Sequence, residues 1–252
     1  MSKSMTAGKW MMQFGNKILA IRNQIIDLIF PKNCVNCGRS DTWLCDECQS
    51  KIRPNIMSQC LVCKKIQADN GICQKCQPFS ALDGLWIMTD YDNKLIENII
   101  RLIKYKYIAE LVDYLGPLME SYFGGKSKLE KDFILIPVPL HRRRFLTRGF
   151  NQAELIAREL SDQYGNEIVD DLIFRRHYNQ PQTNLGAHLR VSNVKGIFKI
   201  NQKVADQLKD KLVVLVDDVY TTGSTMQECA RVLKHGGIKN VWGLAIARGN
   251  SS

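Results

Sequence analysis

The chain has 252 residues, of which 45% are apolar and 24% charged, and its formal net charge is +10. This composition allows a buried core and excludes a fibrous or disordered protein, and the length suits one large α/β domain with a smaller one. The sequence has neither a run of about 18 to 20 uncharged apolar residues nor a secretory leader pattern. We therefore expect a cytoplasmic protein without a transmembrane segment, whose positive surface attracts an anionic partner.

Residues 1–31 form the first expected segment, an amphipathic helix. Between Met11 and Phe30 the apolar residues recur every three or four positions, which is the spacing of a helix with one apolar face. Pro31 ends the helix because proline cannot continue the hydrogen-bonding pattern. We expect the helix to dock on its own protein, and a membrane surface or a partner protein is the alternative.

Residues 32–80 contain eight of the nine cysteines, arranged as four Cys-x-x-Cys pairs. The pairs are Cys34/Cys37, Cys45/Cys48, Cys60/Cys63 and Cys73/Cys76. Two thiolates three residues apart can bind one metal ion from a tight turn, and four pairs supply two tetrahedral zinc sites. Disulfides do not persist in a reducing cytoplasm, and redox pairs normally occur singly. Since thiolates fill every ligand position, we expect a double zinc ribbon with two structural zinc ions.

Neighbouring pairs are expected to share a zinc ion. Seven residues separate Cys37 from Cys45, and nine separate Cys63 from Cys73. Both gaps suit a short zinc ribbon, and the two halves read as an internal repeat. A cross-braced arrangement of the pairs is the alternative.

Residues 81–252 alternate between β-rich and helical stretches, which predicts an α/β domain whose parallel sheet is flanked by helices. The expected strands are 85–90, 133–138, one near 170–174, 211–216 and 241–247, and the expected helices are 95–108, 109–123, 151–164 and 223–235. The polar stretch 177–193 predicts a mobile loop. We expect Lys104 and Lys106 to be surface charges and Cys229 to be a buried apolar residue.

The strongest functional motif lies between the strand 211–216 and the helix that follows it. Its residues are Asp217, Asp218, Val219, Tyr220, Thr221, Thr222, Gly223, Ser224 and Thr225. Open α/β sheets bind ligands at this edge, and the amides and dipole of a helix start favour a phosphate. Paired carboxylates suit sugar hydroxyls or a divalent cation. The motif therefore predicts a site for a sugar phosphate.

This motif resembles the binding site for phosphoribosyl diphosphate (PRPP) in type I phosphoribosyltransferases. The resemblance implies that Asp217 and Asp218 hold the ribose hydroxyls, that Thr221–Thr225 hold the 5-phosphate, and that Mg²⁺ accompanies the diphosphate. It also implies a diphosphate-binding loop within 137–144 and a flexible loop within 175–198. The candidates are His141 and Arg142 in the first loop and Arg175, Arg176, Gln182 and Arg190 in the second.

The cysteine pairs, the Arg148-Gly-Phe-Asn-Gln152 segment, the long loop and the Asp-Asp motif together resemble the ComF family. The resemblance implies a PRPP-binding protein that handles incoming single-stranded DNA during natural transformation, with competence or recombination proteins as partners. A phosphoribosyltransferase that moves ribose 5-phosphate to an unknown acceptor is the alternative, and the catalytic residues are unknown. Arg143, Arg144 and Arg148 are candidate nucleic-acid contacts, with diphosphate binding and simple solvation as the other interpretations.

Overall fold

The computed structural model describes the chain in several stretches. These are residues 31–54, 60, 63, 65, 72–124, 132–176 and 196–249. The expected N-terminal helix, except for Pro31, and the expected loop 177–193 lie outside the described residues. The chain divides into two compact units, Met1–Gln49 and Ser50–Ser252. In the described part of the chain, no helix has the length and apolar character needed to cross a membrane.

The described part of the first unit is a tight loop followed by the short helix α2, Asp46–Gln49. The loop turns back on itself because the amide of Cys34 donates to the Arg39 carbonyl at 2.8 Å. Gly38, with φ of +78°, supplies the left-handed residue that this turn requires. The turn and α2 each present one Cys-x-x-Cys pair.

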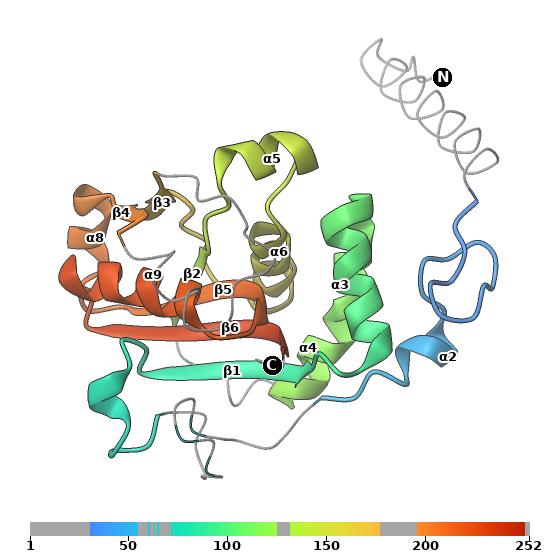
Figure 1. Cartoon of the computed structure of the whole chain (residues 1–252), viewed down its shortest axis with the longest axis horizontal. Helices are drawn as coiled ribbons and strands as arrows, with labels where there is room; N and C mark the ends of the chain where they lie inside the picture. The colour runs from blue at the N-terminus through green and yellow to red at the C-terminus, as the bar shows by residue number, and fades with distance from the viewer. Residues whose placement is uncertain are drawn as a thin grey trace, which may run out of the picture. The chain divides into compact units, whose positions relative to one another are not determined.

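Four parallel strands form the main sheet of the second unit, in the order β1-β6-β5-β2 (Figure 1). Their bounds are β1 Gly84–Asp90, β2 Phe133–Pro137, β5 Leu212–Tyr220 and β6 Asn240–Arg248. In the interior strand β5, residues Val213–Val216 are all buried, as expected for a parallel strand covered on both faces. The predicted parallel sheet flanked by helices is confirmed.

The helices and minor elements complete the second unit. The α-helices are α3 Lys94–Lys106, α4 Gly116–Phe123, α5 Arg142–Arg148, α6 Gln152–Tyr164, α8 Gln202–Leu208 and α9 Ser224–His235. Two 3₁₀-helices, η1 Gln77–Phe79 and η2 Ala109–Leu115, and an antiparallel pair, β3 Ile173–Arg175 with β4 Phe198–Ile200, lie between them.

Helix α9 covers one face of the sheet and an aromatic cluster covers the other. Consecutive strand residues point to opposite faces of a sheet. In β1, the side chains of Leu85 and Trp86 therefore lie on different faces. On the α9 side, a Cβ at Gly243 would lie 2.6 Å from Leu85 Cδ1, so a larger residue there would displace the side chains packed between the strand and α9. On the other side, the Trp86 ring centroid lies 5.0 Å from that of Trp242 and 5.6 Å from that of Phe123 in α4.

Residues of the second zinc ribbon pack in the same hydrophobic core as the sheet. Cys60, Ile72 and Cys76 belong to the same buried cluster as Leu82 and Leu85. The chain after the ribbon is also tied to α9, because the Ala81 amide donates to Gln227 Oε1 at 2.8 Å. The second ribbon and the sheet therefore stabilise one another.

The structure differs from the sequence expectations at four places in the helices. One is α8, which lies in a stretch where no helix was expected. The expected helix 109–123 is split into η2 and α4, because Pro117 cannot donate a backbone hydrogen bond and starts a new helix. The expected helix 95–108 ends earlier, at Tyr107, which has a left-handed φ of +61°. Residues 142–144, expected within the diphosphate-binding loop, instead begin the helix α5, which has His141 as its N-cap and Gly149 as its left-handed C-cap.

The strand β5 is also longer than expected and includes the two aspartates. Pairing with β6 continues beyond Val216, with Asp217 opposite Ala245 and Tyr220 opposite Arg248. Because the neighbouring strand keeps pairing it, the chain stays extended up to Tyr220. The paired carboxylates therefore sit on a rigid strand.

We expect the packing of α9 on the sheet to determine the stability of the second unit. Leu233 is fully buried, so Leu233→Ala should lower the free energy of unfolding by about 2–5 kcal/mol. The same substitution at Leu146, which is 71% exposed, should change it by less than about 0.5 kcal/mol. Urea denaturation of the zinc-loaded chain measures both, and equal losses would contradict the assignment of the core.

Candidate zinc sites and anion-binding cavity

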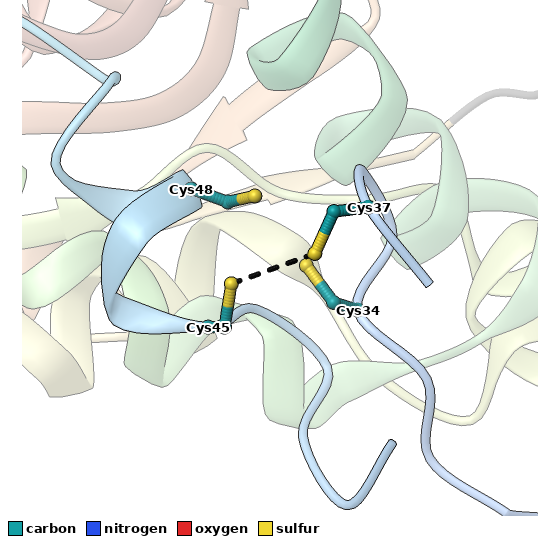
Figure 2. A group of neighbouring side chains, drawn as sticks. All are labelled: Cys34, Cys37, Cys45 and Cys48. Atoms are coloured by element: carbon teal, nitrogen blue, oxygen red, sulfur yellow. Dashed lines mark hydrogen bonds between the residues drawn. The ribbon is translucent and has the colours of Figure 1, made fainter. Parts of the chain in front are cut away.

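The eight paired cysteines gather into two groups of four thiols. The groups are Cys34, Cys37, Cys45 and Cys48 in the first unit, and Cys60, Cys63, Cys73 and Cys76 in the second. Figure 2 shows the first group, whose sulfurs converge from the turn and from the region of α2. This is the pairing of neighbours that the sequence favoured, and it is not cross-braced.

The distances within each group fit one zinc ion. All four sulfurs lie within 4.8 Å of one another. Cys37 Sγ is 3.6 Å from Cys45 Sγ, and Cys63 Sγ is 3.7 Å from Cys73 Sγ. Zn–S bonds of about 2.3 Å in a tetrahedron place the sulfurs about 3.8 Å apart. The two groups are therefore structural zinc sites with no ligand position left for water.

The surroundings of the thiols explain why a metal ion is needed. Burial and hydrogen bonds to neighbouring thiols raise the pKa of Cys76 to about 12, so a bound cation is required to keep four thiolates together. In the first group, Asn36 Nδ2 donates to Cys48 Sγ at 3.2 Å. This hydrogen bond orients the ligand from outside the metal's coordination sphere.

We expect two zinc ions per chain, and one after Cys45→Ala, because three thiolates bind a structural zinc much more weakly than four. Cys229 is the matched control, since it is buried in the core and belongs to neither group. Cys229→Ala should keep two zinc ions per chain. Inductively coupled plasma mass spectrometry measures the content, and loss of zinc from both variants alike would contradict the two groups.

A cavity of about 450 Å³ opens at the carboxyl ends of β2 and β5. Its charged lining comes from four elements that are far apart in the sequence. The charged side chains are Lys104 from α3, Arg144 and Arg148 from α5, Arg175 from β3, and Asp217 and Asp218 from β5. The other lining residues are Tyr91, Tyr105, Val138, Pro139, Leu140, Asn151, Gln152, Val219, Thr221, Thr225 and Gly249.

The two aspartates are arranged so that they cannot both ionise freely. Asp217 Oδ1 accepts a hydrogen bond from the Asp218 amide at 2.8 Å. Lys104 Nζ lies 2.9 Å from Asp218 Oδ1 and neutralises that carboxylate. Burial, together with the neighbouring Asp218, raises the pKa of Asp217 to about 7 despite the opposing effect of Lys104.

Lys104 is therefore a site residue, and its interpretation as a surface charge is wrong. Burial is the largest single effect and opposes the charge, but Asp218, Asp217 and Tyr91 together outweigh it and raise the pKa of Lys104. The signal in the sequence was helical spacing, because Lys104 lies one turn after the buried Ile100. Lys106 is exposed, as expected.

The loop from Thr221 to Gly223 connects the aspartates to α9. Thr221 and Thr225 line the cavity, and the Thr222 hydroxyl hydrogen-bonds with the Ser224 hydroxyl at 2.8 Å. Gly223 has φ of +73°, and a Cβ there would collide with the Tyr220 ring. Tyr220 is itself buried in the hydrophobic core, and its ring packs against Gly223 of this loop.

The predicted basic residues separate into two sets. Arg144 and Arg148 line the cavity, as does Arg175. Arg142 and Arg143 lie on the exposed surface of α5.

The remaining predicted residues either do not line the cavity or lie outside the described chain. His141 Nδ1 accepts the Arg143 amide at 3.1 Å and caps α5. Burial and the neighbouring Arg175, Arg143 and Arg144 lower the pKa of His141, which keeps its acceptor nitrogen available. Arg176 is exposed, and its amide donates to the Ile197 carbonyl at 2.8 Å. Gln182 and Arg190 lie outside the described residues.

Gln152 is a cavity residue that the sequence quoted only as part of a motif. Its side chain is buried, and within the described chain its Nε2 has no hydrogen-bond partner. An unsatisfied buried amide costs about 1–3 kcal/mol, so such groups usually face a ligand, a water or an ion. Gln152 also lines the cavity, so its unsatisfied amide lies in a side chain that borders the space for a ligand.

The raised pKa of Asp217 predicts a pH-dependent stability. A carboxyl with an ordinary pKa of 3.8 and a folded-state pKa near 7 costs almost no stability below about pH 4, becomes increasingly destabilising between pH 4 and pH 7, and has its full cost above pH 7. Asp217→Asn should therefore raise the free energy of unfolding by about 1–4 kcal/mol at pH 8 and by almost nothing at pH 4.

Asp210 provides the control for this measurement. It is exposed, and its pKa is lowered, first by its hydrogen bond with Lys239. Asp210→Asn should therefore give no stabilisation at pH 8. Urea unfolding of the wild type and both variants from pH 4 to 8 measures the difference. A flat difference for Asp217→Asn would contradict the placement of this carboxyl.

The two cysteine groups and the parallel sheet agree with the families that the sequence matches. A model of the double zinc ribbon domain matches residues 25–77, and a model of the phosphoribosyl transferase domain matches residues 146–252. The chain is 26% identical over 201 residues to competence protein ComFC of Bacillus subtilis (strain 168), covering 77% of this chain and 79% of that protein.

Two further relatives extend the comparison. The chain is 36% identical over 115 residues to competence protein F of Haemophilus influenzae, covering 45% of this chain and 50% of that protein. It is 31% identical over 212 residues to DNA utilization protein YhgH of Escherichia coli O157:H7, covering 82% of this chain and 85% of that protein. With a double zinc ribbon ahead of a phosphoribosyl transferase domain and this similarity over most of its length, the chain belongs to the ComF family.

Proposed function

We propose that this protein binds PRPP in the cavity and supports DNA uptake in the cytoplasm by handling single-stranded DNA. The relatives named competence protein and DNA utilization protein support the role in DNA uptake, and the phosphoribosyl transferase domain supports the ligand. The observation that carries the proposal is a single cavity in which paired carboxylates, arginines and an unsatisfied amide meet.

The chemistry of the cavity fits each part of PRPP. Asp217 and Asp218 would accept hydrogen bonds from the ribose hydroxyls, and the start of α9 with Thr221 and Thr225 would bind the 5-phosphate. The cavity volume of about 450 Å³ lies within the usual range for small-molecule sites.

The arginines suit the diphosphate because a guanidinium donates two parallel hydrogen bonds to phosphate oxygens. Arg144, Arg148 and Arg175 line the cavity, and His141 and Arg142 at the start of α5 are proposed to act beside them. The oxygen donors of the aspartates and of the diphosphate are those that Mg²⁺ prefers, and the ion would neutralise part of the diphosphate charge.

Gln152 supplies the most specific test of this proposal. If its buried Nε2 donates to PRPP, then Gln152→Met removes a ligand contact and also removes an unsatisfied group from the free protein. We therefore expect PRPP to bind about tenfold more weakly while the free protein becomes more stable by about 1 kcal/mol or more. A role in folding alone predicts the opposite change in stability.

Isothermal titration calorimetry with PRPP and Mg²⁺ measures the affinity, and urea unfolding measures the stability. The double variant Asp217→Asn with Asp218→Asn should abolish binding, whereas Asp210→Asn, at an exposed site, should not change it. Absence of binding to the wild type would refute the proposed ligand. Acceptor-dependent release of diphosphate, tested with bases, amines and DNA, would identify a transferase instead.

A further inference from the structure

Helix α5 exposes apolar and positively charged side chains together. Its seven residues include four arginines and no acidic residue, and none of the seven is buried. Phe145 is 43% exposed and Leu146 is 71% exposed. A helix that buries no residue against its own protein leaves apolar area available for a ligand.

The end of α3 lies beside α5 (Figure 1). It adds aromatic rings, one of which contacts Arg148 of α5. Tyr105 is 66% exposed, and Tyr107 is also exposed. The Arg148 guanidinium lies 5.9 Å from the Tyr105 ring centroid, a cation–π distance that links the two helices. We call this region the α3–α5 surface. Its members are Tyr105, Tyr107, Arg142, Arg143, Phe145 and Leu146.

The combination of side chains identifies the kind of ligand. Guanidinium groups attract a phosphate backbone, and exposed aromatic rings stack on unpaired bases. In a duplex the faces of the bases are stacked within the helix, so the rings would have no partner. An acidic peptide or a membrane would use the charges but would not depend on base stacking.

We propose that the α3–α5 surface binds single-stranded nucleic acid, with bases stacked on Tyr105 and Phe145 and phosphates held by Arg142 and Arg143. The proposal rests on the proposed function and locates its DNA site. Arg144 and Arg148 belong to the same helix as Phe145 and line the PRPP cavity. A bound strand would therefore lie at the mouth of that cavity.

Fluorescence anisotropy with the full zinc-loaded chain tests the stacking. The probes are an oligothymidylate of about 12 nucleotides and an abasic strand of the same length. Phe145→Ala should weaken binding of the oligothymidylate by about 5- to 100-fold and barely change binding of the abasic strand. The matched control is Phe174→Ala, because Phe174 is 48% exposed on β3, and it should leave both affinities unchanged.

The salt dependence separates the two kinds of contact. Arg142→Gln should reduce the slope of log affinity against log salt concentration by about 0.7, the value for one phosphate of a single strand. Phe145→Ala should leave this slope unchanged, because stacking releases no counterions. A changed slope for Phe145→Ala would overturn the assignment of the ring to stacking.

The outcomes distinguish this proposal from the proposed function. If the wild type binds the oligothymidylate but Phe145→Ala and Phe174→Ala behave alike, the surface is wrongly located and the proposed function stands. Equal affinity for duplex DNA, or for vesicles of anionic lipid, would also overturn the proposal. If the wild type binds no single strand, both this surface and the DNA role fail, whereas PRPP binding is tested separately by calorimetry.

Discussion

The ion pair between Lys104 and Asp218 is the interaction on which the cavity depends. Two consecutive carboxylates at the end of a buried strand repel each other and are costly to ionise. Lys104 compensates for one of them at 2.9 Å and brings the end of α3 to the cavity. The other, Asp217, keeps a pKa of about 7. Hydroxyl donors or a cation delivered with a ligand would supply the compensation that Asp217 lacks.

Gln152 shows the same principle in a neutral group. Asp217 is an imperfectly compensated acceptor and Gln152 is an unsatisfied donor, and both line one cavity. Such local violations of good packing are tolerated in folded proteins mainly where a ligand relieves them. The rest of the unit, with its continuous buried strand and aromatic cluster, supplies the stability that offsets these costs.

The sequence predicted the features that depend on local pattern. The β-branched run in β5 identified a central strand, and the spacing of the cysteines identified two sites of four thiols. The Asp-Asp motif marked a strand end that lines the cavity. It could not predict features that depend on tertiary contacts. Lys104 appeared to be an ordinary helix charge, and the start of α5 was expected within the diphosphate-binding loop that the family resemblance implies. The unsatisfied amide of Gln152 is visible only once its surroundings are known.

Helix α5 contributes side chains both to the cavity and to the exposed surface of the protein. Arg144 and Arg148 line the cavity, while Phe145 and Leu146 remain exposed. The helix is held by its two caps and by the contact between Arg148 and Tyr105 rather than by burial. A ligand that fixes Arg148 from the cavity side would therefore also restrain the Tyr105 ring. Thermodynamic linkage makes this effect reciprocal, so a strand on the outer side would alter PRPP binding by the same factor.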